Sequence, residues 1–259
     1  MEIGNIIFLT LTGALVAASS AYVGSIMVLK RMSLVGDALS HVALPGMAIA
    51  LALGISPIVG AFVFLSFAVL GIWYLEKNSD TYPEALVGLF FTASLAIGVL
   101  ITKEVDLLEA LFGSIEKISV YEGLATIVLS VSVIIVTSLF VKKLMITVIS
   151  EELAQTSSER ISMINLLYYV LVAVIVSIGI RFVGTLLTGS LVIVPAVASK
   201  NISKSMKGYF LMSALFGVIS AVVGIPLSKG LLLPSGPVVV LVSVAIFIIT
   251  FFYKKLLTR

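Results

Sequence analysis

The sequence predicts an all-α integral membrane protein whose helices form a polytopic bundle. Hydrophobic residues make up 60% of the 259 residues, and charged residues make up only 11%. Soluble domains are about 45–50% apolar and about 25% charged, so this chain has too few charges to cover a globule in water. The charges are also separated by long apolar stretches, as expected for helices that cross a bilayer. The composition excludes a soluble domain, a disordered chain and a nucleic-acid-binding protein.

Uncharged stretches define the membrane-spanning helices in chain order. A crossing needs roughly 20 apolar residues, and Gly54 and Pro57 divide the long stretch after Asp37 into two helices. Residues 104–120 could contain a short re-entrant helix, so eight or ten crossings are the alternatives to nine. The nine expected crossings are residues 5–29, 33–53, 58–75, 84–102, 121–141, 162–180, 182–199, 208–228 and 236–253.

Lysine and arginine residues predict the orientation, because short cytoplasmic loops retain positive charge. With the N-terminus outside and the C-terminus in the cytoplasm, twelve of the 16 Lys and Arg residues fall in inner loops. The reverse orientation would place this excess outside. Every loop is short, so residues 1–259 are expected to form one transmembrane domain in the cell membrane, surrounded by lipid.

Nothing in the sequence indicates an enzyme that binds ATP. The chain has no cysteine and no phosphate-binding loop of the form GxxxxGK followed by Ser or Thr. If transport uses ATP, a separate subunit must therefore bind it. We expect a transport subunit with no permanently bound cofactor.

One acid and the only histidine lie inside an apolar helix. Asp37 and His41 occur four residues apart in SLVGDALSHVALPG (33–46), so their side chains share one helix face. An ionisable side chain inside a membrane helix costs about 2.5–3.5 kcal/mol, which makes both residues functional candidates. Pro45 has no N–H, so the carbonyl of His41 loses its helical hydrogen bond. Carboxylates and imidazoles bind divalent first-row transition metals, and the segment predicts a site through which such an ion passes.

Spacing alone leaves several interpretations of this pair open. It is compatible with a transient metal site, with the proton relay of an ion-coupled secondary transporter, and with a polar contact between helices. An intramembrane enzyme with Ser40 activated beside His41 is a weaker alternative, since no further acid or base is visible at membrane depth. One aspartate and one histidine cannot complete a metal's coordination shell. The metal hypothesis therefore calls for a homodimer with this helix at its two-fold axis.

Small residues occur close together in RFVGTLLTGSLVIVPAVASK (181–200). Gly184, Thr185, Thr188 and Gly189 have a spacing that permits close approach between helices. We expect these four residues and Pro45 either to pack helices together or to line a pathway.

The stretch KKLMITVISEELAQTSSERIS (142–162) is the longest expected cytoplasmic connection. Its apolar residues, followed by two glutamates, fit a short helix lying on the inner membrane surface. A solvated connector and a docking element for a cytoplasmic partner are the alternatives.

Six segments together resemble one known family, the permeases of metal-uptake ABC transporters, which import zinc, manganese or iron. The strongest match is the segment that carries Asp37 and His41. The segments, in the order expected for the family, are SLVGDALSHVALPG (33–46), PEALVGLFF (83–91), DLLEALFG (106–113), SEELAQTSS (150–158), FVGTLLTGSLVIVPAVASK (182–200) and PSGPVVVLV (234–242).

The resemblance implies a homodimeric permease that pairs with cytoplasmic ATP-binding subunits and receives its ion from an extracytoplasmic metal-binding protein. It implies that Asp37 and His41 form the transit site for a divalent transition metal, which is the substrate. A permease for metal chelates is the closest alternative, and the family pattern does not specify which metal is carried. The segment implied to couple to the ATPase comprises Glu151, Glu152, Leu153, Ala154, Gln155, Thr156, Ser157 and Ser158.

Overall fold

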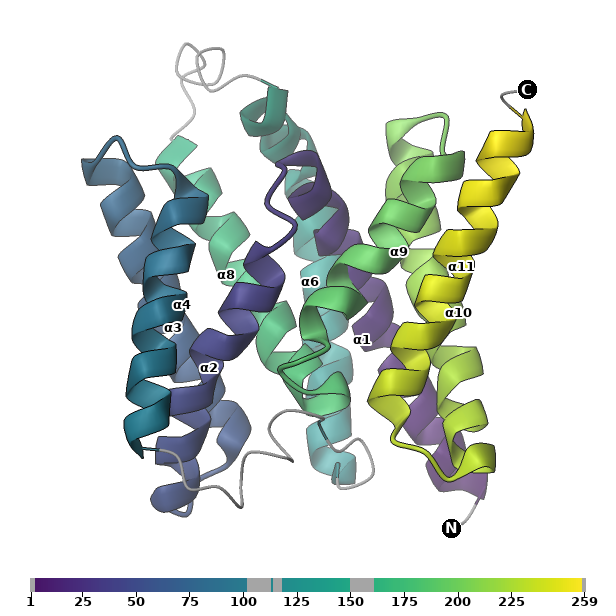
Figure 1. The fold of residues 1–259 in the computed structure, drawn as a ribbon, viewed down its shortest axis with the longest axis horizontal. Helices are drawn as coiled ribbons and strands as arrows, with labels where there is room; N and C mark the ends of the chain where they lie inside the picture. Colours follow the sequence, from purple (N-terminus) through teal and green to yellow (C-terminus); the bar gives the residue numbers. More distant parts are fainter. Residues whose placement is uncertain (1–2, 102–112, 114–117, 150–160, 258–259) are drawn as a thin grey trace.

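The computed structural model describes residues 3–101, 113, 118–149 and 161–257, and in these residues the chain is a bundle of antiparallel helices without strands (Figure 1). The helices are α1 (Ile3–Leu29), α2 (Val35–Ala52), α3 (Pro57–Asn78), α4 (Pro83–Ile101), α6 (Val120–Ile149), α8 (Ile161–Val183), α9 (Thr188–Ile202), α10 (Met206–Leu231) and α11 (Ser235–Leu257).

Local sequence signals explain several helix ends. Gly54, with φ of +70°, separates α2 from α3, and Pro57 stands in the first turn of α3. Ser119 and Glu122 form a capping box at the start of α6. The N–H of Glu122 donates to Ser119 Oγ at 3.2 Å, and the N–H of Ser119 donates to Glu122 Oε2 at 3.0 Å. These signals lie close to the predicted boundaries.

Eight of the described helices are long and apolar enough to cross a membrane. The ninth, α9, has 15 residues, which is about 22 Å of helix and less than the hydrocarbon thickness of about 30 Å. The predicted crossing 182–199 was therefore wrong in its boundaries. Helix α8 continues to Val183, and Gly184, with φ of +80°, ends it before α9 begins at Thr188.

The predicted cytoplasmic connection also differs from the structure. Lys142–Ile149 continue α6 as one helix of 30 residues, so no separate surface helix begins at Lys142. The proposed coupling segment Glu151–Ser158 lies outside the described residues. So does most of 104–120, where the re-entrant helix was expected.

Positive charges gather at one end of the bundle. Because successive helices alternate in direction, the ends of α1, α3, α9 and α11 lie together, and they carry Lys30, Lys77, Lys200 and Lys254 (Figure 1). Helix α1 begins at the opposite end from the one where α11 stops. This grouping matches the predicted set of inner loops, while the assignment of that end to the cytoplasm stays a prediction.

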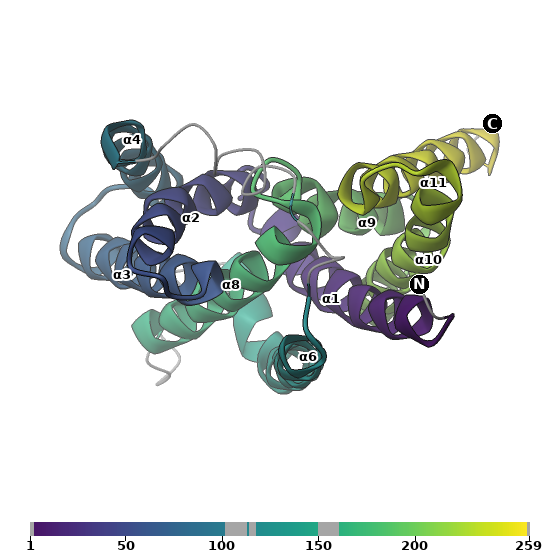
Figure 2. The ribbon, with the colours of Figure 1, turned by 90° about the horizontal axis from the view of Figure 1, so that it is seen from below.

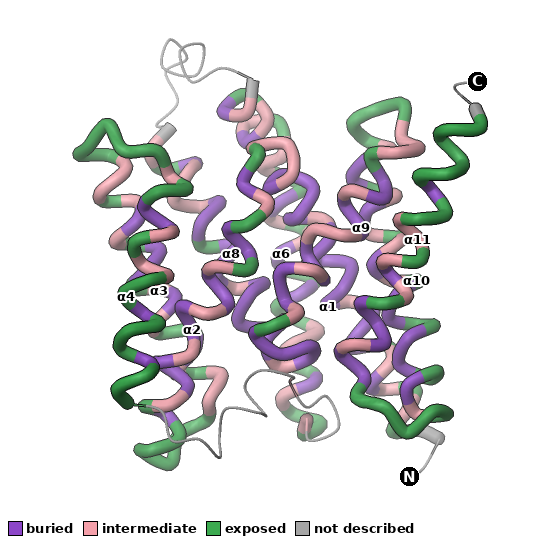
Figure 3. Tube along the Cα trace, in the orientation of Figure 1, coloured by how far each residue is buried: buried purple, intermediate pink, exposed green. Residues whose placement is uncertain are grey.

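The helices pack through small residues and leave apolar side chains on the outside. Buried positions concentrate where helices face each other, whereas α4 and α11 carry long exposed stretches (Figure 3). Viewed along the bundle, α6 lies at one edge and α2, α4, α9 and α11 lie toward the other (Figure 2). Large exposed residues such as Val99, Leu139 and Leu211 suit contact with lipid.

Helices α2 and α3 cross at a pair of glycines. A Cβ atom added to Gly60 would overlap the carbonyl oxygen of Gly46 and lie 2.6 Å from the Cβ of Ala50. The two backbones are therefore too close for any larger side chain at this position.

We expect Gly60→Ala to lower the apparent melting temperature of the detergent-solubilised protein by roughly 5 °C, because overpacking forces the backbones of α2 and α3 apart. Gly230→Ala is the matched control, since a Cβ at Gly230 meets no described atom within 4 Å. Size-exclusion chromatography after stepwise heating measures both variants. Equal melting temperatures for the two would contradict the close crossing.

Candidate functional site

Asp37 and His41 lie in the first two turns of α2, on a face that the chain covers only in part. Asp37 is exposed and His41 is partly buried in the single protomer. Helix α2 begins below the level at which α1 ends, so the pair lies inside the bundle's length and away from its rim (Figure 1). The predicted placement of both residues on one helix face is consistent with this geometry.

The first turns of two helices meet at Asp37. Asp37 belongs to the first turn of α2, and Gly189 belongs to the first turn of α9. A Cβ atom on Gly189 would lie 2.8 Å from the Cβ of Asp37 and 2.9 Å from its Cα, so only glycine allows this approach. The first turns of α2 and α9 are therefore held together at Asp37.

Ser40 joins this part of α2 to the turn between α8 and α9. Its Oγ lies 2.6 Å from the carbonyl oxygen of Thr185 and 2.7 Å from the carbonyl oxygen of Asp37. The side chain is fully buried. Its hydroxyl proton is thus engaged by backbone carbonyls, which argues against Ser40 as a nucleophile activated by His41.

His41 is held against α4. Its imidazole packs edge-on against the ring of Phe91, with the ring centroids 5.7 Å apart and the planes at 65°. One turn farther along α2, Pro45 is buried, and a Cβ on Gly98 of α4 would lie 3.7 Å from its Cγ. These contacts place the first half of α2 against α4.

The partly exposed face of α2 is limited to the start of the helix. Leu34, Asp37, Ala38 and His41 are at least partly exposed, whereas Pro45, one turn after His41, is buried. In the part of the chain that the structure describes, no group of three or more His, Cys, Asp and Glu residues comes together. On this face, one protomer therefore presents one aspartate and one histidine.

The small residues predicted near the pathway all lie at or near this site. Gly189 contacts Asp37, and Thr185 accepts the hydrogen bond from Ser40. Thr188 Oγ1 donates to the carbonyl of Gly184 at 2.6 Å and closes the turn between α8 and α9. All four are buried in the protomer, and whether they also line a pathway stays a prediction.

Sequence reasoning missed two contributors to the site. Ser40 was considered only as a nucleophile, and Phe91 was not singled out. Ser40 stands three residues after Asp37, which places it near the pair, but its bond to Thr185 spans 145 positions. No local pattern predicts a contact of that range.

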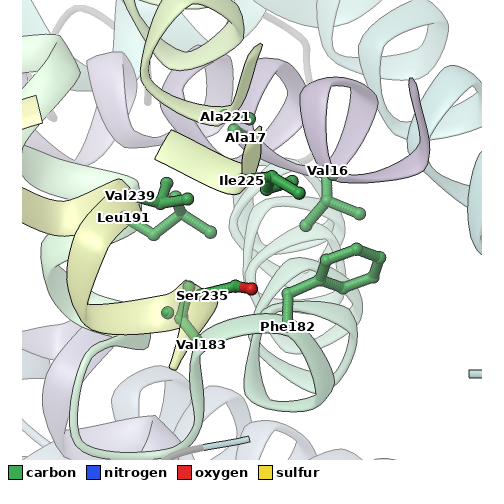
Figure 4. A pocket seen from close by; sticks show the side chains of 11 residues that line it. Val16, Ala17, Phe182, Val183, Leu191, Ala221, Ile225, Ser235 and Val239 are labelled. Atoms are coloured by element: carbon green, nitrogen blue, oxygen red, sulfur yellow. The ribbon is translucent and has the colours of Figure 1, made fainter. Parts of the chain in front are cut away.

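A separate small cavity lies between α1, α8, α9, α10 and α11 (Figure 4). Its lining residues are Gly13, Val16, Ala17, Phe182, Val183, Leu191, Ala221, Ile225, Ser235, Gly236 and Val239. The hydroxyl of Ser235 is the one polar side-chain group among them. Because the lining has no carboxylate or imidazole, this cavity is not a site for a divalent cation.

A family model described as the ABC 3 transport family matches residues 4–254. The chain belongs to this family. The chain is 30% identical to the manganese import system permease protein ScaB of Streptococcus gordonii, over 93% of this chain and 88% of that protein. It is 28% identical to the high-affinity zinc uptake system membrane protein ZnuB of Haemophilus influenzae, over 95% of this chain and 96% of that protein.

The fold agrees with this membership. The solved structure of PsaBC from Streptococcus pneumoniae in complex with Fab superposes with a TM-score of 0.83. The sequences are 28% identical, and the alignment covers 96% of this chain and 92% of that one. The resemblance seen in the sequence is confirmed at the level of family, fold and multi-pass membrane location.

We expect Gly189→Ala to reduce transport several-fold at equal protein level, because the added methyl group pushes α9 and Asp37 apart. Uptake by cells expressing the whole transporter, divided by the amount of permease in the membrane, measures the effect. Gly230→Ala serves again as the control, with open space around its new methyl group. Full transport by Gly189→Ala would show that the close contact at Asp37 is not needed.

Proposed function

We propose that this chain is the permease subunit of an ABC importer that moves a divalent transition metal ion, manganese, zinc or iron, into the cytoplasm. The observation that carries the proposal is the Asp37–His41 pair on the partly exposed face of α2. Membership of the ABC 3 transport family and the names of the manganese and zinc relatives support it.

The pair supplies part of the ion's coordination shell during passage. A carboxylate oxygen of Asp37 and an imidazole nitrogen of His41 replace water molecules that the ion loses on entry. Asp37 also offsets part of the positive charge, which lowers the cost of bringing the ion into the membrane. The site needs to hold the ion only transiently, since tight binding would stop turnover. Weak binding favours release on the far side.

A second copy of the chain completes the site. Two protomers related by a two-fold axis near α2 would bring together two aspartates and two histidines. This number suits a tetrahedral ion and leaves room for water around an octahedral one. The partly exposed face of α2 supports this arrangement, since ionisable side chains in membrane proteins face the interior of an assembly.

Energy comes from a separate cytoplasmic ATPase subunit. The chain carries no Walker A motif in its sequence. The segment Glu151–Ser158, which joins α6 to α8, is the proposed contact with this subunit. ATP binding then switches the bundle between outward-open and inward-open states, and an extracytoplasmic metal-binding protein delivers the ion at the opposite side. Metal choice depends on geometry and delivery, because donor chemistry alone favours the tighter-binding metals.

Removing either side chain should stop metal uptake. In cells that depend on this transporter, we expect Asp37→Ala and His41→Ala to lower accumulation of manganese, zinc or iron at least 10-fold, because each removes a ligand. Elemental analysis of washed cells across the three metals measures the effect and identifies the substrate.

The matched control for this experiment is Asp80→Ala, which removes an exposed carboxylate from the connection between α3 and α4. It should accumulate metal as the wild type does. Unchanged accumulation of all three metals in the Asp37 and His41 variants would overturn the assignment of the site.

The dimer can be tested with single cysteines, because the chain has none of its own. We expect Ala38→Cys, on the partly exposed face of α2, to crosslink to its copy with a short thiol-reactive reagent in membranes. Leu211→Cys, 68% exposed on α10, is the control and should stay uncrosslinked. Denaturing electrophoresis detects the crosslinked dimer as a separate band. If the two α2 helices lie far apart in the assembly, Ala38→Cys will give no dimer band, and this result would contradict the proposed dimer.

A further inference from the structure

A hydrogen bond from Ser40 joins the α2 site to the turn that follows α8. A serine hydroxyl has a single proton, and Ser40 Oγ lies 2.6 Å from Thr185 O and 2.7 Å from Asp37 O. The bond to Asp37 O stays within α2, whereas the bond to Thr185 O joins two separate elements. Ser40 is fully buried, so no water molecule can take the place of the hydrogen bond to Thr185 O.

The turn that accepts this bond is tightly constructed. Gly184, with φ of +80°, donates its N–H to Ile180 O at 2.8 Å and accepts both the N–H and the hydroxyl of Thr188. A Cβ on Gly113, from the same end of the bundle, would lie 2.6 Å from the nitrogen of Gly184. The turn is therefore bonded directly to the end of α8.

The other end of α8 begins directly after the proposed ATPase-coupling segment, and it is held by polar contacts. Trp73 Nε1 donates to the carbonyl of Ser162 at 2.7 Å. Asn165 accepts from Lys30 Nζ at 3.2 Å and donates to Glu76 Oε1 at 3.1 Å. The 23 residues of α8 span about 34 Å, so one rigid helix connects residue 161 to the turn that Ser40 contacts.

A small apolar cavity borders the residues on either side of the turn. It is lined by Phe182 and Val183, just before the turn, and by Leu191, just after it (Figure 4). The packing around the turn is therefore less complete here than in a fully packed interior.

We propose that Ser40 is a positioning residue that ties Asp37 to the turn at the end of α8, so that movement of α8 repositions the Asp37 carboxylate. This inference rests on the proposed function, because it assumes that Asp37 is a metal ligand and that residues 151–158 contact the ATPase. Ser40 itself does not touch the ion. It acts by holding the first turn of α2 against Thr185 and Gly189.

The test is equilibrium binding of Mn²⁺ and Zn²⁺ to the permease purified with its ATPase subunit, with and without a non-hydrolysable ATP analogue. We expect Ser40→Ala to raise the Kd about 10-fold, the usual effect of removing a group that orients a ligand. We also expect the analogue to change the Kd of the wild type and to change that of Ser40→Ala much less, because the link to α8 is lost.

The matched control is Ser177→Ala. Ser177 is a buried serine of α8 whose Oγ donates to Ala173 O at 2.8 Å within the same helix. The Ser177→Ala substitution removes the same hydroxyl group without breaking a contact between helices, so the Kd of this variant should equal that of the wild type. Measuring the Kd on the monodisperse fraction from size exclusion separates positioning from loss of folded protein.

Asp37→Ala in the same assay separates this inference from the proposed function. If Asp37→Ala binds both ions as the wild type does, the metal site itself is wrong. If Asp37→Ala loses binding and Ser40→Ala binds like Ser177→Ala, only the positioning role of Ser40 is overturned. Equal effects of the analogue on the wild type and Ser40→Ala, or no effect on the wild type, would overturn the link to α8.

Discussion

The proposed site depends on a close backbone contact between the first turns of two helices. Asp37 lies in the first turn of α2, and the first turn of α9 packs against it through Gly189. A Cβ atom at position 189 would overlap the Cα and Cβ of Asp37, so this contact requires glycine. The contact fixes where the Asp37 side chain leaves the helix, and the proposed metal site depends on that position.

The arrangement depends on a break in the helical path. If residues 161–202 formed one continuous helix, α9 would have no first turn to pack against Asp37. The break at Gly184–Leu187 exposes backbone groups that would be costly in lipid. Their hydrogen bonds to Ser40, Thr188 and Ile180 satisfy several of these groups inside the protein. The bond from Ser40 also joins α2 to the turn after α8, so it connects the site to the rest of the bundle.

Asp37 is exposed in a single protomer, and this exposure bears on how protomers assemble in the membrane. A polar pair that faced lipid would be expensive, whereas a pair that faces a second protomer can share an ion with it. The rest of the exposed surface named above is apolar and suits lipid. The partly exposed face of α2 therefore differs from the other outer faces in chemistry, and this difference supports the proposed dimer over a monomeric channel.

The sequence by itself determined the membrane class and, within the described residues, most of the helical segments. It also singled out Asp37 and His41 as candidate site residues, and their role stays a prediction. These features depend on composition and on spacing within about 20 residues, which helix geometry translates directly into position. The sequence could not predict that α6 continues beyond Lys142, because charged residues end an apolar stretch without ending the helix. It could not predict the late start of α9 either, because Gly184 and its neighbours are equally typical of residues at which two continuous helices pack.

Only the tertiary structure decided which groups surround Asp37. Ser40 meets Thr185, and Gly189 meets Asp37, across about 145–152 positions of sequence. Such contacts depend on how α1, α2, α8 and α9 pack together, and no local pattern contains that information. The residue types were visible in the sequence, but their roles became clear only when the chain brought the ends of α2 and α9 together.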